Sequence, residues 1–206
     1  MDFTTLATPD TIERTMNALA ERGFQPVAVS SKEEALARIK ELVPAGASVM
    51  NGASETLREI GYLDFLKEGS HPWRNLHDAI IAEADPAAQA RLRRESVVSD
   101  CYVGSVHALT EGGEMLIASN SGSQLPHLAF TSPSVVLVVG SNKVVPTLQD
   151  AFARIAEHIV PLEDARMRSV YGYGTDWSKS LILHKENPAM GRSVHVIIVR
   201  DERLGF

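Results

Sequence analysis

The stretch Ser134–Gly140, SVVLVVG, is the feature that most limits how this chain can fold. Its apolar, mostly β-branched residues follow one another without alternating with polar ones, so both faces of the predicted strand must be covered. A strand buried on both faces is typical of a parallel sheet with helices packed on either side. The run therefore favours an α/β fold.

The first fifty residues indicate the same architecture. An amphipathic helix is predicted over residues 9–22, followed by a short buried strand over residues 24–29. Ser31 and Glu34 have the spacing of a capping box at the start of a second helix, and residues 47–50 form a second strand. This helix–strand alternation favours parallel strands joined by crossover helices.

The rest of the chain completes a predicted Rossmann-like, mostly parallel sheet flanked by helices. Residues 106–109 and 115–118 are expected to pair as one β-hairpin across a Gly-Gly turn. A helix is predicted over residues 147–158, and residues 181–183 and 194–199 are expected to add the last strands of the sheet. No internal repeat interrupts the pattern.

Length and composition bound the possible functions. The 206 residues suffice for one full-sized core, so we predict a single domain over residues 1–206. The net charge is −6 and no basic stretch is concentrated enough to hold a nucleic-acid backbone, so no nucleic-acid partner is expected. No run approaches the ~18 apolar residues of a membrane span, and the first residues lack the regions of a signal peptide. We therefore expect a cytoplasmic protein.

The single cysteine, Cys101, limits redox and metal chemistry. One thiol rules out an intramolecular disulfide, a cysteine-ligated iron–sulfur cluster and a zinc ribbon. The seven histidines show no HExxH or other ligand-like spacing, so no metal site is predicted. Cys101 itself lies in an apolar neighbourhood and is expected to be buried and inert.

Polar loops follow several predicted strands, at the edge where α/β sheets bind ligands. The loop of residues 51–56 offers a glycine, two hydroxyls and backbone amides, which suit a phosphate or a carboxylate. It matches neither a Walker A loop nor a GxGxxG fingerprint, so it does not indicate nucleotide binding. The alternative is that Ser54 merely caps the next helix. The candidate ligand-binding residues are Asn51, Gly52, Ser54, Thr56, Gly112, Asn120, Ser121, Asn142 and Lys143.

Two charged residues carry the candidate chemistry. Glu111 stands beside two glycines in the hairpin turn, where it could act as nucleophile or general base; the alternative is a solvated carboxylate. Lys143 follows the 134–140 strand and could balance an anion, or it could be a surface lysine. We expect both to converge with the 51–56 loop into a site for a small organic anion. The aromatic segment 171–177, YGYGTDW, is expected to be a mobile lid or an anion loop, with a subunit contact as the alternative, which leaves a homo-oligomer open.

The chain resembles the lactate-utilisation (LUD) domain family over about residues 9–200. Four stretches carry the resemblance in the same order, and the joint occurrence of NGASET, TEGG and VVGSNKVV is the specific part. The stretches are SVMNGASETLREIGYLDFL (48–66), SVHALTEGGEMLIASNSG (105–122), VVLVVGSNKVVPTLQDAFARI (135–155) and PLEDAR (161–166).

The resemblance implies a relation to the group of ribose-5-phosphate isomerase, glucosamine-6-phosphate deaminase and CoA transferases, with a Rossmann-like sheet. Residues 51–56 would correspond to the phosphate loop of the sugar-phosphate enzymes. Glu111 is the nearest match to the glutamate that takes the CoA thioester in CoA transferases, although its flanking residues differ.

Two functional hypotheses follow from the resemblance. In the first, the protein is a cluster-free component that binds a small anionic metabolite and supports the oxidation of L-lactate to pyruvate, beside iron–sulfur protein subunits. In the second, it is a self-sufficient isomerase-like or CoA transferase-like enzyme that uses Glu111. The sequence leaves open which applies, and it assigns no cofactor.

Overall fold

The core of the molecule is a six-stranded sheet in which every neighbouring pair of strands runs parallel. The computed structural model describes residues 2–206. The strands lie in the order β1 (Gln25–Val29), β10 (Ser193–Val199), β7 (Ser134–Gly140), β4 (Cys101–Gly104), β2 (Ser48–Asn51) and β3 (Arg74–Asn75). The predicted α/β fold with a mostly parallel sheet is thus confirmed.

Strand β7 lies inside this sheet and is buried on both faces, as its composition predicts. Val136 and Val138 face one hydrophobic cluster, whereas Val135, Leu137 and Val139 face another. This alternation follows from the two-residue period of a strand, which sends successive side chains to opposite faces. The unbroken apolar run is therefore explained by two separate cores, one on each side.

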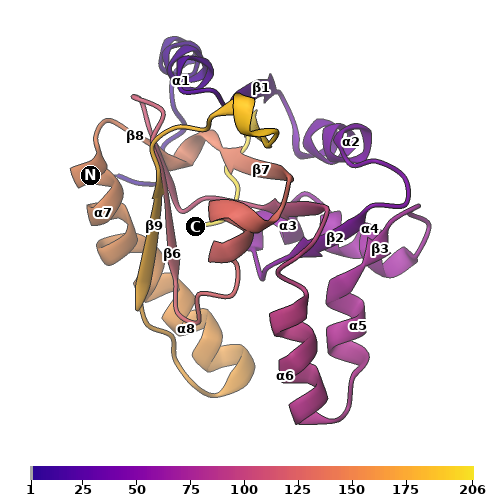
Figure 1. Ribbon diagram of the computed structural model, residues 1–206. Helices are drawn as coiled ribbons and strands as arrows, with labels where there is room; N and C mark the ends of the chain where they lie inside the picture. The colour runs from indigo at the N-terminus through magenta and orange to yellow at the C-terminus, as the bar shows by residue number, and fades with distance from the viewer. Residues whose placement is uncertain (1) are drawn as a thin grey trace.

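Helices and a second sheet cover the two faces of the main sheet (Figure 1). One face packs against α2 (Lys32–Leu42), α3 (Glu55–Glu59) and α4 (Tyr62–Glu68). The other face packs against α1 (Pro9–Glu21) and the second sheet. Helix α7 (Leu148–Arg154) packs on the outer side of that second sheet and encloses a third hydrophobic cluster.

The second sheet contains the predicted hairpin. Its strands lie in the order β8 (Val144–Val145), β5 (Ala108–Thr110), β6 (Met115–Ser119) and β9 (Lys179–Leu183), and β5 pairs antiparallel with β6. The prediction that residues 181–183 complete the main sheet is wrong, because β9 pairs antiparallel with β6 instead. Its half-exposed residues suit the edge of a mixed sheet, whereas a parallel interior strand would be buried throughout.

Two helix predictions need correction in detail. The Ser31 hydroxyl accepts from the Glu34 amide at 3.3 Å, but the Glu34 carboxylate accepts from the Ser30 amide, so the capping box is only half formed. The helix expected over residues 147–158 continues through a π-helical turn into α8 (Val160–Tyr171). Phe152 is 38% exposed and stacks on Trp177.

The remaining helices, α5 (Leu76–Ala82) and α6 (Pro86–Glu95), project together from the edge of the main sheet beyond β3 (Figure 1). Asp85 caps α6 by accepting from the amides of Ala87 and Ala88, each at 3.2 Å. Within residues 2–206, none of the helices combines the length and the apolar character that crossing a membrane requires.

Replacing Gly113, in the turn of the β5–β6 hairpin, by alanine should cost more stability than the same change at Gly46, in the turn before β2. Gly113 and Gly46 have similar φ angles, +88° and +80°. A Cβ atom on Gly113 would lie 3.0 Å from both the Ala18 carbonyl carbon and the Arg22 Cδ. A Cβ atom on Gly46 would meet nothing within 4 Å. Gly46→Ala should cost about 1 kcal/mol of unfolding free energy through its backbone conformation. Gly113→Ala should cost about 1 kcal/mol more, because overpacking adds to strain. Equal losses in urea denaturation would contradict the contact.

Candidate functional site

A cavity of about 590 Å³ opens where the carboxyl ends of several strands in the main sheet meet the second sheet. The loop after β2 contributes residues 52–56, Ser105 follows β4, and Lys143 lies just beyond β7. His107 and residues 118–121 add the adjoining ends of β5 and β6. The cavity thus lies at the carboxyl edge, where the sequence predicts a site.

Lys143 is the cationic centre of this cavity and is only 5% exposed. Its Nζ donates to Thr56 Oγ1 at 2.8 Å, to Ser105 Oγ at 3.1 Å and to the Val106 carbonyl oxygen at 3.2 Å. All three acceptors are uncharged, so none of these partners neutralises the ammonium. A buried cation with neutral partners leaves a net positive field, which favours an anion beside it.

Burial lowers the pKa of the Lys143 ammonium to about 7, because leaving water penalises the charged form. Arg154, buried on α7, lowers this pKa further by like-charge repulsion, and Glu59 at the end of α3 raises it. The side chain therefore exists as a mixture of ammonium and amine near neutral pH. An anionic ligand would shift that mixture toward the ammonium.

His107 lines the same cavity in its neutral form. Burial, with repulsion from Lys143 and Arg154, lowers the pKa of its imidazole to about 3. Its Nδ1 accepts a hydrogen bond from the Ala118 amide at 3.2 Å, which places the ring proton on Nε2. The cavity thus contains a neutral hydrogen-bond donor as well as a cation.

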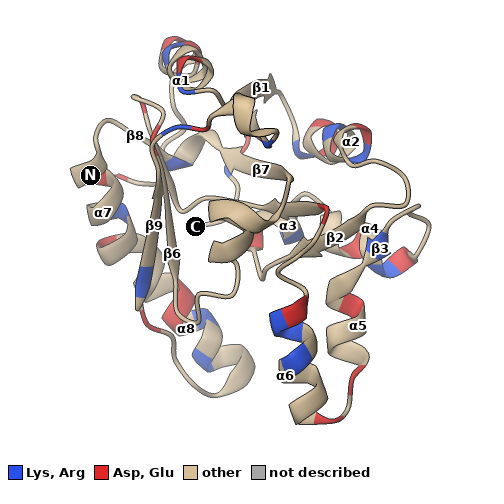
Figure 2. Cartoon of the chain, viewed as in Figure 1, with Lys and Arg blue, Asp and Glu red and all other residues tan. Residues whose placement is uncertain are grey.

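The opposite wall comes from α8 and the segment that follows it. Arg166 on α8 binds Glu163 at 2.7 Å and Glu55 at 3.6 Å, so carboxylates already balance its charge. Tyr173 and Trp177 line the cavity from the aromatic segment, and Tyr173 is 61% exposed. Figure 2 shows blue segments, which mark Lys and Arg positions, on α8 and on α6, the two helices that supply the lining residues Arg166 and Arg93.

The segment after β10 closes the cavity on the side of Lys143. Its backbone is held at three points: Leu204 N donates to Asn142 Oδ1 at 3.1 Å, Gly205 N donates to Glu59 Oε2 at 2.7 Å, and the Phe206 oxygen accepts from Arg154 at 2.8 Å. A Cβ on Gly205 would lie 3.1 Å from Lys143 Nζ, so this backbone packs directly against the lysine.

The structure brings six of the predicted site residues together and leaves four elsewhere. Those that line the cavity are Gly52, Ser54, Thr56, Asn120, Ser121 and Lys143. Those that do not line it are Asn51, Glu111, Gly112 and Asn142. Asn142 is buried and anchors the Leu204 amide, which is a structural task.

Glu111 and Gly112 lie away from the cavity because they form the turn of the hairpin. An antiparallel hairpin places its turn at the end opposite to the start of β5 and the finish of β6, which is where His107 and Ser119 line the cavity. Glu111 instead pairs with Arg14 of α1 at 2.9 Å. The expected convergence of Glu111 with Lys143 at one rim is therefore wrong.

Several cavity residues were not predicted as site residues. Ser105 follows β4, a four-residue strand that the sequence pattern did not reveal. Tyr102 of β4 fills the space that two glycines leave: a Cβ on Gly52 would lie 3.1 Å from its hydroxyl, and one on Gly104 would lie 2.6 Å from its ring. Gly52 thus makes room for a tyrosine, a role that its place in a polar loop could not indicate.

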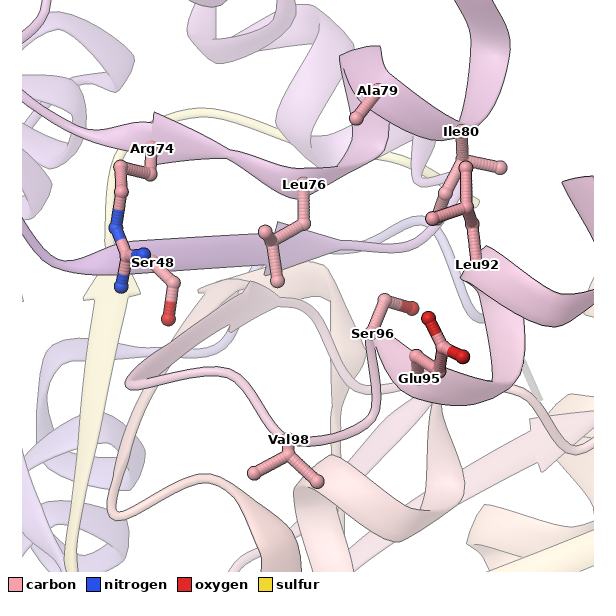
Figure 3. Close-up of a pocket in the computed structure, with 9 residues that line it drawn as sticks. All are labelled: Ser48, Arg74, Leu76, Ala79, Ile80, Leu92, Glu95, Ser96 and Val98. Atoms are coloured by element: carbon pink, nitrogen blue, oxygen red, sulfur yellow. The ribbon is translucent and has the colours of Figure 1, made fainter. Parts of the chain in front are cut away.

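A smaller cavity of about 280 Å³ lies at the amino end of β2, bordered by α5 and α6 (Figure 3). Ser48 and Arg74 lie at one side of it, and Glu95 and Ser96 at the other. The polar groups near Ser48 are mutually paired, since Asp100 accepts from the Ser48 amide and hydroxyl at 2.8 and 2.7 Å. This cavity lacks a buried uncompensated charge and is the weaker candidate.

The lowered pKa of Lys143 predicts how stability changes with pH. The unfolded lysine has its ordinary pKa of 10.5 and the folded one a pKa of about 7, so the unfolded state binds more protons between these values. The contribution of Lys143 to the unfolding free energy should therefore rise with pH across that window and level off above it. Urea denaturation of the wild type and of Lys143→Met at several pH values measures the difference. Parallel profiles for the two proteins would contradict the shift.

The sequence and the fold both have matches among known proteins. The family model described as the LUD domain matches residues 12–199. The fold is similar to the crystal structure of a DUF162 family protein from Deinococcus radiodurans, with a TM-score of 0.57 and 12% sequence identity, covering 95% of this chain and 99% of the other. No curated protein matches the sequence. At this identity the structural match concerns the fold alone.

Proposed function

The chain belongs to the LUD domain family, which is associated with lactate utilisation, and we propose that it binds a small organic carboxylate beside Lys143 as a cluster-free component of that process. Gly52, Ser54 and Thr56 would border the ligand on one side, and Asn120 and Ser121 on another. With one cysteine, the chain would rely on separate iron–sulfur subunits for electron transfer.

The burial of Lys143 among uncharged partners is the observation that carries this proposal. Placing an ammonium in a cavity costs free energy unless a counter-charge joins it. Hydroxyls from Thr56 and Ser105 can orient a ligand but cannot neutralise the lysine. A carboxylate from solution would supply the missing negative charge and would accept a charge-assisted hydrogen bond from Lys143 in place of one of its three present partners.

Glu111 has no role at the proposed ligand, because its side chain does not line the cavity. An isomerase-like or transferase-like enzyme that uses Glu111 would need its carboxylate beside the reacting atoms. The side chain instead contacts Arg14 on the far side of the hairpin. The proposal therefore assigns binding to the cavity and leaves Glu111 as part of the contact between α1 and the hairpin.

Ligand-dependent stabilisation tests the proposed function. Lactate, pyruvate, ribose 5-phosphate and CoA would each be added to the purified protein while its thermal unfolding is followed. A ligand at 100 times its Kd should add about 2.7 kcal/mol of stability. We expect lactate or pyruvate to raise the Tm more than equal concentrations of chloride or of the uncharged lactamide do. No shift with either acid would overturn the proposal.

A further inference from the structure

We propose that Lys143 forms a covalent imine with the carbonyl carbon of a 2-oxo acid held in the cavity. The inference rests on the proposed function, because pyruvate, a 2-oxo acid, is the oxidised form of lactate. It goes beyond that function, because it assigns to the chain a covalent reaction that simple anion binding does not need. The ligand class is a carboxylate with an adjacent ketone or aldehyde carbon.

The surroundings of Lys143 suit an amine that must exist without its charge. Its side-chain partners Thr56 Oγ1 and Ser105 Oγ are hydroxyls, which can donate to an amine lone pair as well as accept from an ammonium. Lys67, by contrast, is exposed and pairs with the Asp64 carboxylate at 3.3 Å. Lys143 is thus set apart by position, burial and partners.

Burial and the nearest cation both lower the pKa of Lys143, and one carboxylate opposes them. Arg154 approaches from α7 and lowers the pKa of the lysine, while Glu59 from α3 raises it and His107 from the β4–β5 connection is neutral. With burial, these groups bring the pKa to about 7, so roughly half of the molecules carry an uncharged amine at neutral pH. Only that form has the lone pair needed for attack on a carbonyl.

The step is balanced with the groups present. The Nζ lone pair of Lys143 adds to the carbonyl carbon, and the π electrons of the carbonyl move to its oxygen. A proton passes from nitrogen to that oxygen, the resulting carbinolamine loses water, and a C=N bond replaces the C=O bond. His107 is a positioning residue here, since its Nε2–H can donate to the carbonyl oxygen as charge develops. Nothing is oxidised or reduced.

Reductive trapping tests the imine directly. The full chain would be incubated with pyruvate and sodium cyanoborohydride, and adducts would be located by intact mass and peptide mapping. We expect a single reduced pyruvate adduct on Lys143, at least tenfold above the level on Lys67, and none with lactate, which lacks a ketone carbonyl. The rate should rise with pH through about 7 and then level off as the amine becomes fully uncharged.

Two variants make the result decisive. Lys143→Arg keeps a cation but lacks a nucleophilic amine, so it should give no adduct at this position. His107→Gln, which keeps a donor and removes the ring, should slow trapping and leave the pH midpoint in place. Pyruvate binding without any adduct on Lys143, or an adduct spread evenly over exposed lysines, would overturn the imine alone. Absence of lactate and pyruvate binding altogether would overturn the proposed function instead.

Discussion

Replacing Lys143 with methionine is expected to weaken lactate binding by roughly ten- to a hundred-fold, because a charge-assisted hydrogen bond is worth about 1.5–3 kcal/mol. Methionine keeps the length and apolar character of the stem while removing the charge. Calorimetry at pH 6, below the lysine pKa of about 7, measures the loss where most of the wild-type side chain is charged. Lactate is the probe of choice because it has no ketone carbon with which the amine could form an imine.

Lys67→Met serves as the matched control for that experiment. It makes the same chemical change on α4, at a side chain that is 75% exposed and lies outside the cavity lining. We expect its Kd for lactate to equal that of the wild type. Equal affinities for the wild type and Lys143→Met, with both proteins folded by circular dichroism, would show that the anion binds elsewhere.

Replacing Leu137 with alanine is expected to cost about 2–5 kcal/mol of unfolding free energy, a large share of a typical domain's stability. Leu137 is fully buried in β7, on the face that packs against α1 and the second sheet. The change removes apolar contact and leaves a cavity that close-packed neighbours fill only in part. Urea denaturation measures the loss as a lower midpoint.

Leu162→Ala provides the comparison, since Leu162 lies on α8 and is 37% exposed. Its loss should stay within about 0.5–1 kcal/mol, because much of its surface is in water in both states. If the two substitutions cost the same, β7 would not be the rigid centre that its burial indicates.

The architecture could be predicted because its signals are local. The unbroken apolar run of β7 requires cover on both faces, and this demand can be read without knowing which segments supply the cover. The same reasoning placed residues 51–56 and Lys143 at one edge, since carboxyl ends of parallel strands share an edge. Strand β4 could not be predicted because its four residues are too few to show a hydrophobic periodicity.

The candidate site was predicted less completely because its geometry depends on long-range packing. Glu111 and Lys143 both follow strands, but they follow strands of different sheets, and the hairpin turns Glu111 toward α1. The burial of Lys143 depends in part on Gly205, sixty-two positions later in the chain, and its pKa depends in part on Arg154 of α7. Partners so distant in the chain leave no local pattern around residue 143.

The strand order also has a consequence for how the protein is made. Among the described strands, β1 pairs in the main sheet only with β10, which is synthesised long after it. Until residues 193–199 have been synthesised, β1 has no neighbour with which to complete its ladder. Over that interval the nascent chain carries an unpaired strand, a state that favours mispairing and chaperone binding.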